Sequence, residues 1–234
     1  MIAVFAPTSP KEPAATRRST ANALLPGALL ILVGILSFAG LLDGVREHGD
    51  LSSLDRPTLR WFVAHRDALA TTTLTLVTDI SSELVLPILV AILAAVWLWR
   101  ARDWWRPALL LSAMAFATAL SYVVKHVVAR PRPPAGSMFP PVETTFSFPS
   151  GHTLGAATFV LVAGYLLWST RRTFSAWVLW VAGGTAVIVA VAVSRLYLGY
   201  HWLTDVIAST ALAAIVLGIV IMVDRWARNT DLIR

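Results

Sequence analysis

Six apolar runs divide the chain into alternating hydrophobic and polar segments. The runs lie at roughly 24–42, 83–99, 107–124, 153–168, 176–193 and 203–223. An α-helix needs about 20 apolar residues to cross about 30 Å of hydrocarbon, and flanking Ser, Thr and Trp side chains extend the shorter runs into the interface. The pattern therefore predicts an all-α, polytopic membrane helix bundle of six transmembrane helices over residues 23–226.

Polar segments flank the first two runs. Residues 1–22 are rich in Pro, Ala, Ser and Thr, a composition typical of a disordered tail, and residues 227–234 form a second short tail. Between the first two runs, Asp55-Arg56-Pro57 resembles an N-cap followed by proline, ahead of Leu59 and Trp61. This predicts an outer amphipathic interfacial helix within 43–82, which either gates lipid access or closes the bundle.

Composition agrees with a membrane protein. Of the 234 residues, 57% are hydrophobic and 14% are charged, and the mean hydropathy is +0.70. A soluble domain of this length needs more polar surface. The net charge of +6 does not form a basic stripe with interleaved aromatic residues, so no nucleic-acid partner is expected. The chain has no cysteine, which excludes disulfides, thiolate metal sites and a cysteine nucleophile.

The distribution of positive charge predicts the orientation. With the N-terminus inside, 11 of the 19 lysine and arginine residues lie on the inner side, as the positive-inside rule favours. Four of the outer eight lie in or beside the motifs described below, at Lys125, Arg130, Arg132 and Arg195. We therefore expect both tails to be cytoplasmic in the cell membrane, with the motif loops on the outer face.

Charged residues at membrane depth cost roughly 2.5–3.5 kcal/mol each on insertion scales and usually mark function. His201 and Asp205 stand four residues apart at the start of the sixth run, so they share one helix face. A carboxylate bound to one imidazole nitrogen sets the tautomer and leaves a lone pair on the other. The pair therefore predicts a nucleophile or base, although most such pairs only satisfy each other.

Pro149-Ser150-Gly151-His152 opens the fourth run. Ser150 is a good N-cap, and Gly151 lets an anion approach the backbone at a helix N-terminus. His152 stands where an imidazole could protonate a departing oxygen. An ordinary capped helix with an interfacial histidine explains the same tetrapeptide.

Lys125, Arg132 and Arg195 add three cations near this site, against the single motif carboxylate of Asp205. Guanidinium groups bind phosphate oxygens in pairs and an ammonium acts as a point charge, so the excess suits a phosphate dianion. Arg130 competes with Arg132, because the stretch reads Arg-Pro-Arg-Pro and spacing alone does not choose. Each cation taken singly also fits snorkelling to headgroups.

A metal site is not expected, because metal-dependent phosphoryl transfer uses several carboxylates or a His/Asp cluster. The one motif carboxylate is committed to His201, and no cofactor is implied. Glu143 lies in the same outer loop without a motif and receives no role. Glu83 is interpreted as an interfacial or cap residue.

Together the three motifs resemble the signature of the type 2 phosphatidic acid phosphatase superfamily, which also includes vanadium haloperoxidases. The resemblance covers residues 125–205 and rests on Lys125-x6-Arg132-Pro133, Pro149 through His152, and Ser194-Arg195-x5-His201-x3-Asp205. It selects Arg132 over Arg130. The first 80 residues lie outside the pattern.

The resemblance implies a role for each matching residue. His201 forms a phosphohistidine with Asp205 orienting it, and His152 protonates the leaving oxygen. The phosphoryl oxygens are held by Lys125, Arg132, Ser150, Gly151 and Arg195.

The implied protein is a metal-independent membrane lipid phosphatase, acting on phosphatidic acid, phosphatidylglycerophosphate or a polyprenyl diphosphate. The alternatives are a lipid phosphotransferase that uses the same intermediate, and a phospholipid-binding or transport protein without enzymatic activity.

Overall fold

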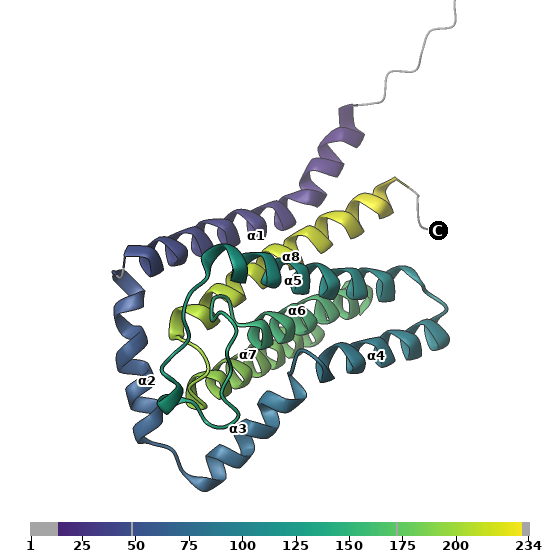
Figure 1. Ribbon diagram of the computed structural model, residues 1–234. Coiled ribbons are helices and arrows are strands. Elements are labelled where there is room, and N and C mark those ends of the chain that lie inside the picture. Colours follow the sequence, from purple (N-terminus) through teal and green to yellow (C-terminus); the bar gives the residue numbers. More distant parts are fainter. Residues whose placement is uncertain (1–13, 48, 172, 231–234) are drawn as a thin grey trace, which may run out of the picture.

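The computed structural model describes residues 14–47, 49–171 and 173–230, and within these ranges the regular structure is entirely helical (Figure 1). Its helices are α1 (Ala14–Glu47), η1 (Asp50–Leu54), α2 (Asp55–Ala64), α3 (Ala68–Ile80), α4 (Val85–Ala101), α5 (Trp105–Val128), η2 (Ala135–Ser137), α6 (Gly151–Arg171), α7 (Phe174–Tyr197) and α8 (Leu203–Asn229). The predicted all-α class is confirmed.

Five helices, α1, α5, α6, α7 and α8, are long and apolar enough to cross a membrane on their own. α4 has 17 residues and passes the same test together with α3, from which it is bent by 55°. The predicted count of six is therefore reached when the bent pair is one span. The break falls at Ser81–Leu84, where the Ser81 and Ser82 side chains bond to nearby backbone.

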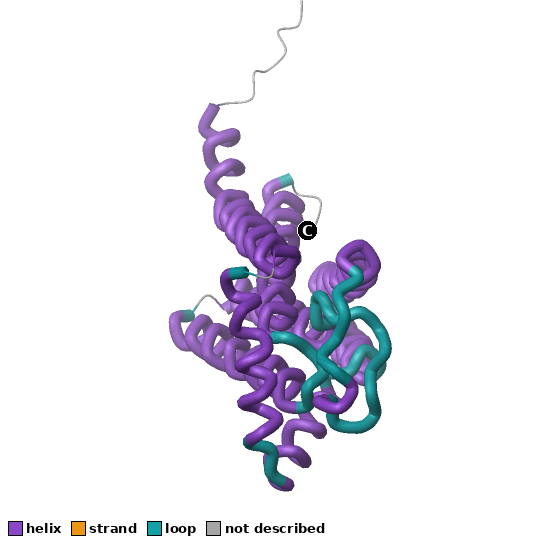
Figure 2. The backbone as a smooth tube through the Cα atoms, turned by 60° about the vertical axis from the view of Figure 1, so that its left-hand side comes forward, coloured by secondary structure: helices purple, strands orange, loops and turns teal. Residues whose placement is uncertain are grey.

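α6 and α8 form the centre of the bundle. About half of the spanning window of each is buried, 50% and 56%, compared with 17% for α1 and 11% for α7. α1 lies along α8 (Figures 1 and 2), and a Cβ placed on Gly27 would stand 2.6 Å from the Gly218 carbonyl oxygen. Glycine at this crossing lets the two backbones approach closely. The outer faces of α1 and α7 keep large apolar side chains exposed, as lipid contact requires.

The helix boundaries differ from the predicted tails. Residues 1–13 and 231–234, which lie within the two predicted tails, are outside the described residues. α1 begins at Ala14 instead of residue 23, and α8 continues to Asn229 beyond residue 226. Residues 14–25 contain no proline or glycine, so the local sequence does not stop the helix at residue 23.

The predicted outer segment, residues 43–82, contains η1, α2 and α3, of which α3 belongs to the bent pair, and α2 crosses one end of the bundle (Figure 1). The sequence predicts a helix after an N-cap at Asp55, and α2 is present there, with Leu59 buried and Trp61 exposed. The predicted N-cap is wrong: Leu54 is the cap residue, without a side-chain cap bond. The Asp55 carboxylate instead points inward and is only 3% exposed, because it bonds to distant cationic and polar groups.

Hydrogen bonds attach this outer segment to the end of α7. Arg66 Nε donates to the Tyr197 carbonyl at 2.9 Å, and Arg66 Nη2 donates to the Ser137 carbonyl at 2.7 Å. The Asp67 amide donates to the Tyr197 hydroxyl at 2.8 Å. These bonds hold the α2–α3 connection against the loop that carries the third motif.

Candidate active site

His201 and Asp205 meet where the loop after α7 enters α8. His201 is 1% exposed and Asp205 is fully buried, and His201 Nδ1 lies 3.2 Å from Asp205 Oδ2. The same oxygen accepts the Trp202 amide at 2.9 Å, so the carboxylate also closes the first turn of α8. A carboxylate only accepts hydrogen bonds, and Nδ1 therefore carries the hydrogen and Nε2 the lone pair.

The electrostatic surroundings keep this imidazole neutral. Burial lowers the pKa of His201 well below its usual range, and the charges of Arg132, Arg195 and Lys125 lower this pKa further. A neutral imidazole with a fixed Nδ1–H is the form that acts as a nucleophile.

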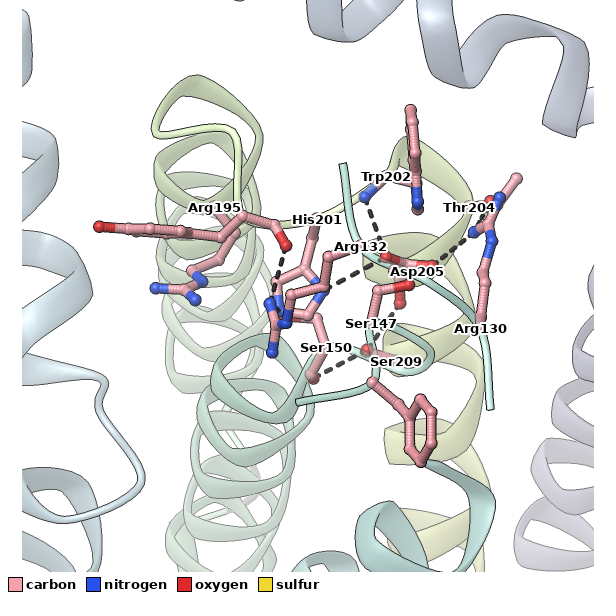
Figure 3. Close-up of polar contacts among 12 residues, drawn as sticks. Arg130, Arg132, Ser147, Ser150, Arg195, His201, Trp202, Thr204, Asp205 and Ser209 are labelled. Atoms are coloured by element: carbon pink, nitrogen blue, oxygen red, sulfur yellow. Dashed lines mark hydrogen bonds and ion pairs between the residues drawn. The ribbon is translucent and has the colours of Figure 1, made fainter. Parts of the chain in front are cut away.

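Arg132 contacts the second ring nitrogen of His201, Nε2, which carries the lone pair (Figure 3). Its Nη1 is 3.1 Å from His201 Nε2 and donates to the Tyr200 carbonyl at 2.7 Å. Its Nε donates to the Thr145 carbonyl at 2.7 Å and its Nη2 to the Thr145 hydroxyl at 2.9 Å. These bonds place the guanidinium beside the reactive atom of the imidazole.

Arg195 lies on the other side of the site, at the end of α7. It is fully buried, and its guanidinium stacks 4.3 Å from the centre of the Tyr200 ring. Its Nε and Nη1 are buried and have no hydrogen-bond partner in the part of the chain that the structure describes. Buried guanidinium N–H groups without partners are costly unless a ligand satisfies them, so this side chain is a candidate anion seat.

Glu143 bridges the two arginines, a contact that the sequence did not reveal. Its Oε2 is 2.7 Å from Arg132 Nη2 and its Oε1 pairs with Arg195 Nη2, while its side chain is 28% exposed. Glu143 is the one acidic residue between Arg130 and Ser150, and that isolation among cations was the available signal.

The second motif forms the start of α6. Ser150 Oγ accepts the Thr153 amide at 3.4 Å, which confirms the predicted N-cap. A Cβ on Gly151 would stand 2.1 Å from Glu83 Oε1, so the Glu83 side chain lies against the first turn of α6. His152 makes no hydrogen bond to the described part of the chain, but it lies within electrostatic reach of Arg195 and His201.

Lys125, in the last turn of α5, completes the group of cations. Its Nζ donates to the Phe146 carbonyl at 2.8 Å, and its charge acts on His201 and Arg132. The structure thus brings all of the sequence-predicted residues to one place: Lys125, Arg132, Ser150, Gly151, His152, Arg195, His201 and Asp205.

Arg130 and Arg132, which spacing alone did not distinguish, go to different partners. Arg132 faces His201 Nε2, whereas Arg130 Nη1 lies 2.5 Å from Asp205 Oδ1 and Arg130 Nη2 lies 2.6 Å from Asp55 Oδ2. Asp205 is therefore not committed to His201 alone. Among the described residues, no three His, Asp or Glu side chains group as metal ligands do.

The fold and this geometry define a polytopic membrane protein with a buried histidine facing an arginine-lined anion seat. The sequence profile of the PAP2 superfamily matches residues 106–229, more than half of the chain. The protein belongs to this superfamily.

Several relatives of known name also match this chain. Phosphatidylglycerophosphatase B of Escherichia coli K12 is 44% identical over 73 residues, which are 30% of this chain and 26% of that protein. Phosphatidylglycerophosphatase B of Bacillus subtilis is 35% identical over 137 residues, 56% of this chain and 64% of the relative. An undecaprenyl-diphosphatase of Sulfolobus acidocaldarius is 32% identical over 113 residues, 45% of this chain and 48% of the relative. The chain thus matches about a quarter of the E. coli relative's length.

The fold also matches a solved structure. The crystal structure of a transmembrane PAP2 type phosphatidylglycerolphosphate phosphatase from Bacillus subtilis superposes with a TM-score of 0.72 at 24% sequence identity. The match covers 87% of this chain and 97% of that chain.

Proposed function

We propose that this protein is an integral membrane phosphatase that removes the terminal phosphate from a lipid phosphate or diphosphate. The observation that carries the proposal is a pair of buried N–H groups on Arg195 that have no partner among the described residues, on a guanidinium whose charge acts on the His201 imidazole. A phosphoryl group seated there satisfies the guanidinium and presents phosphorus to the imidazole. The names of the relatives support phosphatidylglycerophosphate and a polyprenyl diphosphate as substrate candidates, and the motif resemblance adds phosphatidic acid.

An apolar cleft supports a lipid as the substrate. It has a volume of about 780 Å³ and lies between α4 and α5, where its walls include Leu86, Val90 and Met114. Lys125 and Gly151 line the same cleft, so its polar end reaches the anion seat. A lipid therefore keeps its tail among apolar side chains while its phosphate meets the cations.

The chemistry follows from the side chains in the site. Nε2 of His201 attacks phosphorus as Arg132 moves from that nitrogen to a phosphoryl oxygen, and the bond from phosphorus to the leaving oxygen breaks. His152, which takes up a proton when the phosphate dianion is bound beside it, gives that proton to the leaving oxygen. The neutral imidazole then takes a proton from a water molecule, which attacks the phosphohistidine, breaks its P–N bond and releases phosphate. Lys125 and Arg195, with Ser150 and the Gly151 amide, hold the charge that develops on the phosphoryl oxygens.

The test of this function is release of inorganic phosphate from a panel of lipid phosphates by detergent-purified protein in excess chelator. We expect turnover in chelator and none in His201→Gln. Quenched reactions with labelled substrate should leave acid-labile phosphate on the wild type. Full activity in His201→Gln, or activity that needs added magnesium, contradicts the mechanism. Label that passes to an added lipid instead of water identifies a phosphotransferase.

We also propose that both termini are cytoplasmic and that the site opens on the outer face. The absence of cysteine makes this directly measurable. Val142→Cys reports on the exposed loop beside the site, and Arg102→Cys on the connection between α4 and α5 at the opposite end. A membrane-impermeant maleimide applied to intact cells should label the first variant only. Labelling of Arg102→Cys alone reverses the orientation.

A further inference from the structure

A buried chain of contacts runs from the outer helix α2 to the back of the proposed nucleophile. Asp55 Oδ2 lies 2.6 Å from Arg130 Nη2, and Arg130 Nη1 lies 2.5 Å from Asp205 Oδ1. The side chains of Asp55, Arg130 and Asp205 are 4%, 13% and 0% exposed. Asp205 Oδ2 then bonds to His201. Figure 3 shows Arg130 on the side of Asp205 away from His201.

We propose that Arg130 and Asp55 are positioning residues for the phosphoryl-transfer reaction, acting through Asp205 on His201. The inference rests on the proposed function for its kinetic test. It gives α2, the outer helix without an assigned role, a part in building the active site.

Two further contacts fix the position of the Arg130 guanidinium. Its Nη1 also donates to the Thr204 hydroxyl at 2.8 Å, and its guanidinium carbon lies 5.6 Å from the centre of the Trp202 ring. Asp55 supports the same region, because its Oδ1 accepts the Thr204 amide at 2.9 Å and its Oδ2 accepts the Thr204 hydroxyl at 2.8 Å. Asp55 thus joins α2 to the first turn of α8, one residue before Asp205.

The physical role of Arg130 follows from the burial of Asp205. A fully buried carboxylate stays ionised only when a cation or several hydrogen bonds compensate its charge. Arg130 supplies that compensation at Oδ1 and leaves Oδ2 to accept from Nδ1 of His201. Without Arg130 the carboxyl takes up a proton or turns, and the imidazole loses the partner that keeps its lone pair on Nε2.

The phosphate seat is built from other groups. Arg132 and Arg195 make their contacts with Thr145, Tyr200 and Glu143. None of these contacts involves Arg130. A change at Arg130 or Asp55 should therefore slow the chemical step and leave phosphate binding intact, whereas general loss of structure affects both.

The experiment compares Arg130→Gln, Arg130→Lys and Asp55→Asn with the wild type. We expect kcat to fall about 10- to 100-fold in Arg130→Gln, the usual range for a partner that orients an active group, with partial recovery in Arg130→Lys. The inhibition constant for inorganic phosphate should change by less than about threefold, as additivity of independent sites requires. Arg56→Gln, an exposed neighbour of Asp55 on α2, is the matched control and should keep wild-type kcat.

Two results overturn the inference. One is wild-type kcat in both Arg130→Gln and Asp55→Asn. The other is a loss of kcat matched by an equal loss of phosphate binding and a lower melting temperature, which means a structural role only. Should Arg130→Gln fail to fold, Asp55→Asn carries the same comparison.

A readout without turnover separates this inference from the proposed function. In protein labelled with ¹⁵N at histidine, the wild type should show His201 as the Nδ1–H tautomer, identified by its loss in His201→Gln. Arg130→Gln should shift or broaden this signal, and Arg56→Gln should not. An unchanged signal in Arg130→Gln contradicts the inference even if no substrate is ever found, and absent turnover in the wild type contradicts only the proposed function.

Discussion

The Glu143 carboxylate occupies two of the guanidinium groups that are proposed to bind substrate phosphate. It pairs with Arg132 at 2.7 Å and with Arg195. A bound phosphate dianion meets the same cations and is repelled by the carboxylate. Replacing Glu143 by glutamine keeps the shape of the side chain and removes its charge. We therefore expect Glu143→Gln to bind phosphate more tightly than the wild type.

The magnitude follows from the exposure of the bridge. Partly exposed ion pairs contribute about 0.2–1 kcal/mol each, and the 28% exposure of Glu143 places its two pairs near the upper part of that range. Loss of both contributes about 1–2 kcal/mol to phosphate binding, which corresponds to a roughly 5- to 30-fold lower inhibition constant.

The assay is competitive inhibition of lipid phosphate hydrolysis by inorganic phosphate, measured in detergent at fixed ionic strength. Glu47→Gln, at the exposed end of α1, removes one negative charge away from the two arginines and serves as the control. An inhibition constant that is unchanged or higher in Glu143→Gln refutes the competition and indicates that Glu143 instead holds the arginines in their binding positions.

Three further predictions concern the cleft, the nucleophile and the helix packing. Ala115→Trp, which fills the cleft between α4 and α5, should raise the KM for a long-chain lipid phosphate several-fold but not the KM for a short soluble one. The control, Ala186→Trp on the exposed face of α7, should change neither KM. Equal KM changes for both substrates contradict binding of the lipid tail in the cleft. The pKa of His201 is lowered in the folded state, so below about pH 6.5 the unfolded chain binds a proton at this histidine and the folded protein does not. The contribution of His201 to the stability of the fold is therefore complete above about pH 6.5 and is lost as the pH falls. The melting temperature should accordingly fall more steeply on acidification in the wild type than in His201→Asn, and parallel curves would falsify the assignment. Gly27→Ala should lower the melting temperature, because the added Cβ would stand 2.6 Å from a backbone oxygen of α8, and overpacking of this kind costs about 1–3 kcal/mol. Gly40→Ala is the control, since its Cβ would meet nothing within 4 Å. Equal melting temperatures of the two variants contradict the close crossing of α1 and α8.

The sequence alone determined the features that depend on short stretches of chain. Apolar runs of spanning length predicted the six membrane segments, because burial in lipid demands continuous hydrophobicity. Ser150 before Gly151 predicted the start of α6, and the four-residue spacing of His201 and Asp205 predicted their contact. The last two follow from helix geometry within one or two turns.

The tertiary structure decided which charges meet across the fold. Arg130 and Arg132 have the same chemistry and stand two residues apart, yet one supports Asp205 and the other faces His201. Asp55 reaches Arg130 across 75 residues and Glu143 reaches Arg195 across 52. Periodicity carries no information on such pairs, because ion pairing depends on where distant segments are packed and on how little water remains between them.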